Sequence, residues 1–553
     1  MEIFFTILIL TLIVSLSGVV IHILPFQIPL PLMQIVLGAL LAWPKFGLHV
    51  DFNPELFLVL FIPPLLFSDG WKMPARDFLR HCGEIVSLAL VLVIITVVGI
   101  GYFIYWIVPG MSLVAALALA AVLSPTDAVA LSGIVKEGRI PKTLMNILQG
   151  EALMNDASGL VLLKFAIAVA MGTMAFTVGG VSLEFIKVAA GGLLVGVSVT
   201  WGYSKLLRLI IRWSCDDSAT QTVLLLLLPF VAYLIAEHVG VSGILAAVAS
   251  GMTIGQYGMT SSNAPLALRL RGNSVWSMLE FIFNGIVFIM LGLQLPDILA
   301  TSINQAKLDP TIQTWMLFTD VVFLYVALML LRFSWLWLMK RISLRFMKKR
   351  PMVFCEYSTQ EILIASFAGV RGAITLAGVL SIPLQLSDGT AFPSRYQLVF
   401  IATGVILLSL ICCVIILPLL LRGIAVSDTD TVLFHKEEQI ARMIAAEVAI
   451  ESIRQIEFQL ANSQEYNFEK QIVNEVSVRV ISHLRRRIDG HADAESAILM
   501  NHWERSMWLN ALRAERCEYY HLCTQQKISN DILIKLLRDL DLLEALLIEK
   551  KHE

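Results

Sequence analysis

Asn155 and Asp156 lie within GEALMNDASGLVLLKFAIAVAM, a stretch that is otherwise apolar enough to cross a lipid bilayer. A carboxylate at that depth costs several kcal/mol unless it is protonated, paired or in contact with water. Such a group can hold a proton or a small cation. Carboxylate and amide oxygens suit a hard alkali cation and not a transition metal, whose His and Cys ligands are missing here. These two residues therefore predict an ion or proton site.

Two further polar groups belong to the same pattern. Glu151 lies one helical turn before Asn155 and shares its face, whereas Asp156 is one step round the helix. Upstream, SPTDAVALSG places Thr126 and Asp127 in the middle of another apolar stretch. Competition between a proton and a cation at one of these carboxylates would be the chemistry of exchange.

The SPTDAVALSG segment also predicts a broken helix. Pro125 removes a backbone donor in mid-span, and a break of this kind must face protein or a water-filled cavity. Asp127 would stabilise the N-terminus of the second half-helix. A simple proline kink that Asp127 caps is the alternative.

A second interruption lies seven spans downstream, in GVRGAITLAG, where Gly369 and Gly372 flank Arg371. Elements separated by seven spans run in opposite directions, so the pair predicts an inverted repeat with two crossed, broken helices, as in secondary transporters. Asp127 and Arg371 would neutralise the opposing helix ends. Two unrelated interruptions are the alternative.

These sites must be positioned by a bundle of membrane helices. The chain has 553 residues, of which 57% are hydrophobic and 15% charged, and its mean hydropathy is +0.77. This composition predicts an all-α integral membrane protein. We expect about 13 transmembrane helices, with 12 as the alternative count. The predicted spans are 3–22, 28–43, 55–68, 85–106, 113–134, 147–172, 182–204, 220–237, 241–255, 275–294, 315–338, 360–383 and 396–421.

Loop charges predict the topology. Alternate loops carry 17 Lys and Arg, whereas the intervening loops carry only Lys45, Lys307 and Arg395. Because basic loops stay in the cytoplasm, the N-terminus is expected outside and the C-terminal tail inside. No basic segment or cleavage site precedes the first apolar run, so no cleaved signal peptide is expected.

The composition changes after the last span, which predicts a transmembrane domain over 1–421 and a cytosolic helical regulatory domain over 422–553. Residues 424–553 contain 16 Lys and Arg against 22 Asp and Glu. Arg485, Arg486 and Arg487 form a basic run that favours a solvated helix face or, alternatively, contact with anionic lipid or a regulatory ligand. The seven cysteines are scattered and have no metal-ligand or redox spacing.

Six motifs resemble the monovalent cation/proton antiporters, specifically the NhaP-type and NHE-type sodium/proton exchangers, and most closely their bacterial YjcE-like branch. They are PPLLFSDG, SPTDAVA, GEALMND, VSGILAAVASG, FIFNGIVFIMLGLQL and GVRGAITLAG, in that order between residues 63 and 378.

The resemblance implies a site residue by residue. Asp156 would bind Na⁺ and the proton, with Asn155 and Thr126 beside it and Asp127 balancing the helix dipoles of the crossing. Glu151 and Arg371 would form a structural ion pair, and Asp69 would lie near the ion path. Asparagine before Asp156 is the pattern of electroneutral exchangers. Ala152 departs from the family, where Ser is frequent, and this leaves the preference for Na⁺ over K⁺ open.

The leading hypothesis is therefore a secondary antiporter that exchanges cytoplasmic Na⁺ for external H⁺, one for one, by elevator-like alternating access. A homodimer is expected. K⁺/H⁺ exchange is the alternative within this class, and a cation channel is the alternative outside it, although no TVGYG-like filter occurs. The motifs HExxH, GxSxG and GxGD are absent, so an intramembrane enzyme is not expected. We expect no cofactor, since no P-loop is present, and no nucleic-acid partner.

Overall fold

The computed structural model describes residues 2–23, 28–42, 57, 59–134, 140–172, 178–212, 218–255, 266–308, 313–346, 357–383, 385 and 392–422, together with short helical pieces between residues 443 and 543. The chain divides into two compact units, Met1–Val426 and Ser427–Glu553. Each unit is described by itself. The basic run at 485–487 lies outside the described residues.

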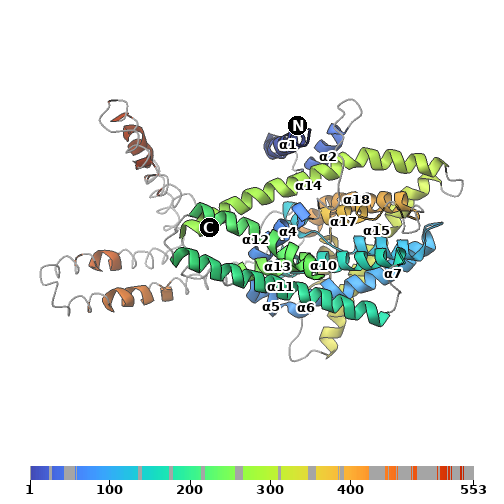
Figure 1. The fold of residues 1–553 in the computed structure, drawn as a ribbon, viewed down its shortest axis with the longest axis horizontal. Coiled ribbons are helices and arrows are strands. Elements are labelled where there is room, and N and C mark those ends of the chain that lie inside the picture. Colours follow the sequence, from blue (N-terminus) through green and yellow to red (C-terminus); the bar gives the residue numbers. More distant parts are fainter. Residues whose placement is uncertain are drawn as a thin grey trace. The chain divides into compact units, whose positions relative to one another are not determined.

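The elements of the first unit are all helices (Figure 1). In chain order they are α1 (Glu2–Ile23), α2 (Leu30–Leu41), α4 (Ile62–Lys72), α5 (Ala75–Arg80), α6 (Cys82–Val86), the π-helical turn η1 (Ser87–Val91), α7 (Leu92–Ile107), α8 (Leu113–Leu123), α9 (Ala128–Ile134), α10 (Lys142–Ala170), α11 (Val178–Arg212), α12 (Ser218–Val239), α13 (Gly243–Thr253), α14 (Leu266–Leu308), α15 (Thr314–Phe346), α16 (Thr359–Phe367), α17 (Ala373–Leu380) and α18 (Arg395–Leu421).

Each predicted span overlaps one or more of these helices. Among the described residues, seven helical stretches are long and apolar enough to cross a membrane. They are Cys82–Ile107, Thr143–Ala170, Glu184–Ile210, Ala219–Val239, Gly272–Gln305, Trp315–Ser343 and Arg395–Leu421. Four shorter apolar helices lie in α1, α2, α8 and α13. The all-helical membrane fold is confirmed, and the count of 13 crossings stays a prediction.

Several helices begin where the sequence supplies a capping side chain. Ser112 accepts a hydrogen bond from the backbone of Ala115 at the start of α8. Ser242 does the same for Leu245 at the start of α13. Ser358 and Glu361 form a reciprocal capping box at the start of α16. These side chains satisfy backbone donors that have no partner inside the helix.

Two of the predicted spans are interrupted in the structure. Helix α8 ends at Leu123 and α9 begins at Ala128, while α16 ends at Phe367 and α17 begins at Ala373. The two interruptions contact each other directly, because the backbone N–H of Asp127 donates to the carbonyl of Val370 at 2.7 Å. Crossed, broken helices are therefore present where the sequence predicts them.

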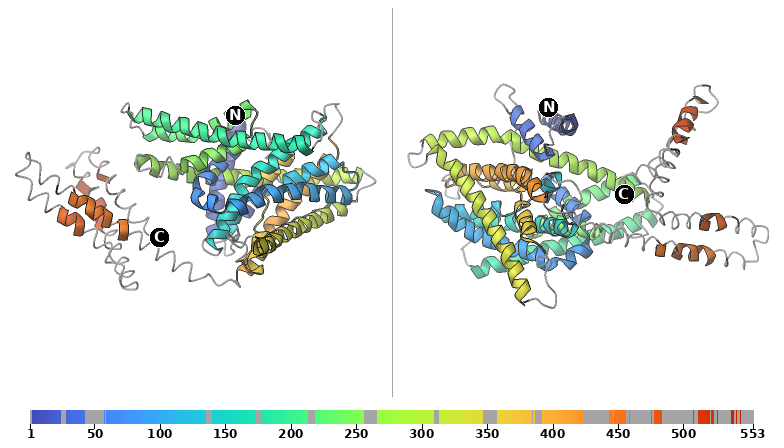
Figure 2. Two further views of the ribbon diagram at one scale, coloured as in Figure 1. Left: turned by 90° about the horizontal axis from the view of Figure 1, so that it is seen from below. Right: turned by 180° about the vertical axis from the view of Figure 1, so that it is seen from behind.

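The helices pack as two bundles. We call α1, α2, α4, α11, α12, α13 and α14 the scaffold bundle, because these helices pack mainly on one another. We call α7, α8, α9, α10, α15, α16, α17 and α18 the crossing bundle, since they surround the two interruptions. Figure 1 shows α14 running along α1 and α2, and Figure 2 shows α15 (yellow) beside α18 (orange).

Glycines bring backbones together inside the scaffold bundle. A Cβ atom at Gly292 of α14 would overlap the carbonyl oxygen of Ile35 in α2. A Cβ atom at Gly251 of α13 would overlap the carbonyl oxygen of Phe67 in α4. Close approach of this kind lets van der Waals contact hold membrane helices together. The α2–α14 and α4–α13 pairs are therefore held by direct contact between their backbones.

The surroundings of Gly292 and Gly99 predict that replacing each by alanine changes the stability of the protein in opposite directions. We expect Gly292→Ala to lower stability by about 1–3 kcal/mol, because the added methyl group overpacks the contact. Gly99→Ala in α7, where nothing lies within 4 Å of the added atom, should raise stability by up to about 1 kcal/mol through helix propensity. Thermal unfolding of the two purified variants would measure this. A shift of the same sign in both would contradict the packing argument.

Candidate functional site

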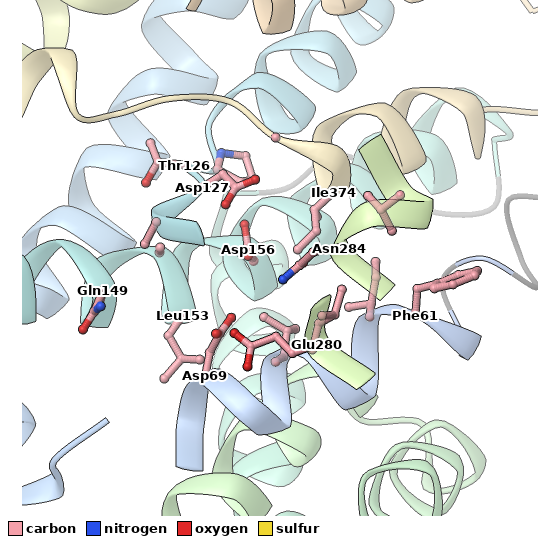
Figure 3. A pocket seen from close by; sticks show the side chains of 18 of the residues that line it. Phe61, Asp69, Thr126, Asp127, Gln149, Leu153, Asp156, Glu280, Asn284 and Ile374 are labelled. Carbon is pink, nitrogen blue, oxygen red and sulfur yellow. The ribbon is translucent and has the colours of Figure 1, made fainter. Parts of the chain in front are cut away.

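Four of the predicted polar residues, Asp69, Thr126, Asp127 and Asp156, line a cavity of about 310 Å³ inside the first unit. Its walls come from α4, α9, α10, α14 and α17 and from the interruption at 125–127, so both bundles contribute (Figure 3). Its polar lining residues are Asp69, Lys72, Thr126, Asp127, Ser132, Gln149, Asp156, Glu280, Asn284 and Thr375.

Asp156 points into the middle of this cavity (Figure 3). Its side chain is 8% exposed. Among the described residues, none forms a hydrogen bond or an ion pair with its carboxylate. A carboxylate in this position is expected to take its counterpart from the cavity, as a proton, a cation or water.

Asn155 forms hydrogen bonds with the interruption between α8 and α9. Its amide oxygen accepts from the backbone N–H of Thr126 at 3.3 Å, and its amide nitrogen donates to the hydroxyl of Thr126 at 2.8 Å. Asn155 is not among the residues that line the cavity. The structure therefore places Asn155 behind Thr126, which does line the cavity, and ion binding by Asn155 stays a prediction.

Asp127 lies where two half-helices begin. Its carboxylate accepts from the backbone N–H of Ala130 at 2.9 Å, at the start of α9. It also packs so closely on Gly372, which precedes α17, that a Cβ atom there would overlap it. A negative charge is favourable at helix N-termini because of the exposed N–H groups and the helix dipole.

Arg371 lies where the other two half-helices end. Its guanidinium donates from Nε to the carbonyl of Leu123 at 3.1 Å, at the end of α8. It also donates from Nη1 to the carbonyl of Gly369, just beyond α16. The backbone N–H of Arg371 donates to the hydroxyl of Ser409 in α18 at 3.1 Å. Asp127 and Arg371 thus occupy the opposite ends that the sequence assigns to them.

The predicted ion pair between Glu151 and Arg371 is wrong. Glu151, which is 1% exposed, instead pairs with Arg332 of α15 through both of its oxygens, with Nη2–Oε2 at 2.7 Å. Arg332 also donates from Nε to the carbonyl of Ala365 at 3.1 Å, in the last turn of α16. The physical reason is that backbone carbonyls of the crossing already engage the Arg371 guanidinium, whereas Arg332 reaches Glu151 with two parallel bonds.

Asp69 lies at the polar side of the cavity, on α4. Figure 3 shows it turned toward Glu280 of α14. Glu280 is held by an ion pair with Lys72 and by a hydrogen bond from the Ser68 hydroxyl at 3.1 Å. No described residue pairs with the Asp69 carboxylate. Asp69 is therefore in the cavity with Asp156, and its place on an ion path stays a prediction.

This geometry leaves a simple charge pattern in the crossing bundle. Arg332 compensates Glu151, and Arg371 and Asp127 compensate opposite ends of the broken helices. Asp156 is left without a protein partner among the described residues. Within the same part of the chain, no three His, Cys, Asp or Glu side chains converge on a resident metal site. At Asp156 the arrangement fits reversible binding of a small positive charge.

The comparison with known families fits this arrangement. Residues 8–423 match the family described as "Sodium/hydrogen exchanger, transmembrane". The chain belongs to the sodium/hydrogen exchanger family. It is similar to the "Uncharacterized Na(+)/H(+) exchanger YjcE" of Escherichia coli, with 66% identity over 552 residues and all of both chains covered.

A second relative of this exchanger carries a broader name. It is the "Sodium, potassium, lithium and rubidium/H(+) antiporter" of Bacillus pumilus, 39% identical over 534 residues, with 96% of this chain and 75% of the relative covered. Among solved structures, the fold resembles the sodium proton antiporter MjNhaP1 from Methanocaldococcus jannaschii. The TM-score is 0.55 at 18% identity, with 76% of this chain and 99% of the other covered. The exchanger is thus a multi-pass membrane antiporter and has the NhaP antiporter fold.

Three residues of the exchanger's site are not among the site residues predicted from the motifs: Arg332, Glu280 and Asn284. Sequence patterns do carry a signal for Arg332, because an arginine within a span needs a partner and a buried carboxylate is the usual one. Asn284 lies within FIFNGIVFIMLGLQL, but the sequence alone favours an interhelical contact for it. Which helix supplies each partner depends on the tertiary packing, which helical spacing does not give.

The Glu151–Arg332 pair predicts an asymmetry between single and double substitutions. Arg332→Ala leaves a buried carboxylate without compensation and should cost about 3–5 kcal/mol of stability. Glu151→Gln combined with Arg332→Gln removes both charges and should cost much less. Thermal unfolding of the purified exchangers would compare the two. If the double variant were as unstable as Arg332→Ala, the pair would not be the source of the effect.

Proposed function

We propose that this exchanger moves Na⁺ out of the cytoplasm in exchange for external H⁺, one for one, with Asp156 carrying the cation and the proton in turn. The observation that carries the proposal is the Asp156 carboxylate, which is buried at the cavity and has no partner among the described residues. A carboxylate there lowers its energy by binding either a proton or a cation, and binding one excludes the other.

The charge pattern supports a one-for-one stoichiometry. Asn155, beside Asp156, is neutral, and both of its amide groups are engaged with Thr126. Glu151 is compensated by Arg332 and does not line the cavity. One carboxylate of the crossing bundle is therefore available for exchange, and replacing one Na⁺ by one H⁺ leaves the charge of the site unchanged.

The exposure of the lining residues supports a cavity that opens toward the cytoplasm. Lys72, Ser132 and Gln149 line the cavity and are exposed, so they mark its mouth. Lys72 and Ser132 adjoin the two basic loops at 72–80 and 136–142 that the topology places inside. Phe57 and Ile62, which also line the cavity, are buried. We assign this structure to the inward-facing state.

The two bundles support alternating access by movement of one bundle against the other. Glu151–Arg332 lies within the crossing bundle and Lys72–Glu280 within the scaffold bundle. Lys164 of α10, by contrast, pairs with Glu237 of α12 at 3.0 Å and so joins the two bundles. An elevator-like displacement of α10 with the crossing would have to separate this pair.

K⁺/H⁺ exchange is the second candidate function. The Bacillus pumilus relative is named for sodium, potassium, lithium and rubidium. Ala152, which lines the cavity, adds no oxygen that would favour the smaller cation. The cation that gives the lowest KM decides between the two candidates.

We further propose a homodimer through the membrane domain, in the bacterial inner membrane, with the N-terminus outside and a cytosolic regulatory domain after residue 421. The family resemblance supports the dimer, and the loop charges support the orientation. Binding of anionic lipid or a regulatory ligand to the tail would act from the cytoplasmic side.

The first test is Asp156→Asn in everted vesicles from cells that lack other sodium/proton antiporters. Adding Na⁺ should collapse a preformed pH gradient with the wild-type protein and leave it unchanged with Asp156→Asn, because the amide cannot carry the proton. Glu184→Gln, at a half-buried acid on α11 outside the cavity lining, is the matched control and should keep wild-type exchange. Full activity in Asp156→Asn would refute the site, and running Na⁺ and K⁺ in parallel would rank the two candidate functions.

The second test links the bundles. Cysteines at positions 164 and 237, in a background without the native cysteines, would be joined by a short thiol-reactive cross-linker. Cross-linking should stop exchange by fixing α10 to α12, and cleavage of the link should restore it. Glu184 and Lys187 form an ion pair within α11. Cysteines at these two positions provide a control link that should leave exchange intact. Undiminished exchange after complete linking of 164 to 237 would rule out movement between the bundles.

A further inference from the structure

Asn284 lies on α14, on the wall of the cavity opposite Asp156. Figure 3 shows its amide directed toward Asp156 across the middle of the cavity, with the nitrogen foremost; a half-turn of the amide group brings its oxygen to the same place. The side chain is partly buried, and among the described residues none forms a hydrogen bond with its amide. An interhelical contact would occupy that amide with a partner. The structure therefore favours a role inside the cavity.

The packing of α14 holds Asn284 in this direction. On the adjoining face of the helix, Gly285 packs so closely on Val14 and Gln34 that a Cβ atom would overlap Val14. On the cavity side, Glu280, Asn284 and Phe288 follow one another at four-residue spacing and all line the cavity. The helix cannot rotate without breaking the glycine contacts, so this stripe stays on the cavity side.

Within this stripe, Asn284 is the polar group available to an ion. Glu280 is engaged by Lys72 and Ser68, and Phe288 is apolar and buried. An amide oxygen is a hard, neutral ligand of the kind that alkali and alkaline-earth cations accept. Because it is neutral, it adds a ligand for a cation without adding a charge to the exchange cycle.

We propose that Asn284 is a cation ligand supplied by the scaffold bundle, and that its reach toward Asp156 sets the preference among alkali cations. The proposal rests on the cation/proton exchange proposed above. A bound cation would be held between a carboxylate of one bundle and an amide oxygen of the other, whereas a proton on Asp156 needs no ligand from α14. Asn284 thus favours the cation over the proton in the inward-facing state and is lost as a ligand when α10 moves away.

The test measures KM for Na⁺, K⁺ and Li⁺ in everted vesicles for three proteins besides the wild type. Asn284→Ala should raise KM for Na⁺ about tenfold, the effect of losing one ligand of a charged group. The pH at which protons half-inhibit exchange, extrapolated to zero Na⁺, should change little. Asn284→Gln keeps the oxygen on a longer stem, so it should raise the ratio of KM for K⁺ to KM for Na⁺. Ser277→Ala, at an exposed position of α14 two turns before Asn284 and outside the cavity lining, is the control and should match the wild type.

The outcomes separate this inference from the proposed function. A wild-type protein without cation-dependent proton flux would refute the exchange itself. A wild-type protein that exchanges, with KM values in Asn284→Ala and Asn284→Gln within twofold of its own, would overturn the role of Asn284 alone. If Asn284→Ala is inactive, the Na⁺-dependent rise in thermal stability of the purified protein decides: a loss of that rise supports the ligand, and an unchanged rise overturns it. If Asn284→Ala does not fold, the selectivity ratio of Asn284→Gln decides in the same way.

Discussion

The contact between the two interrupted helices is the constraint on which the rest of the site depends. Backbone groups that leave a helix inside a bilayer must find partners in the protein, because lipid offers none. Here the interruption at Asp127 and the interruption at Arg371 satisfy each other, through the bond to the Val370 carbonyl and the bond from Arg371 to the Leu123 carbonyl. The positive N-terminal ends of the half-helices meet Asp127, and the negative C-terminal ends meet Arg371. Helix α10 packs against this crossing.

The pairing of these buried charges determines which carboxylate of the crossing bundle remains available for transport. Arg332 balances Glu151, and Arg371 serves the carbonyls of the crossing without pairing with Asp156. Had Arg371 paired with Glu151, Arg332 would be a buried cation in need of another carboxylate, and Asp156 would be the nearest candidate on α10. The observed pairing leaves Asp156 to the cavity, which is why the partner of Glu151 matters for function although neither Glu151 nor Arg332 lines the cavity.

The sequence predicts the membrane fold, both interruptions and the residues at them, because proline, glycine and charge inside apolar spans have few physical explanations. It does not predict the partner of Glu151. Helical spacing places Glu151 and Asn155 on one face but does not say which other helix that face meets. Asn155 and Asn284 show the same limit: each is a polar residue in a span, and packing decides that Asn155 supports Thr126 while Asn284 faces Asp156.

The central claim is that Asp156, the carboxylate of the crossing bundle that has no partner among the described residues, exchanges one proton for one cation. The most direct measurement is the number of protons that the purified exchanger releases when Na⁺ binds, obtained by calorimetry in buffers with different heats of ionisation. At a pH low enough for Asp156 to be protonated before Na⁺ binds, the account predicts close to one proton per bound Na⁺ in the wild type, and neither binding nor release in Asp156→Asn. Release of two protons, binding without release, or unchanged release in Asp156→Asn would contradict it.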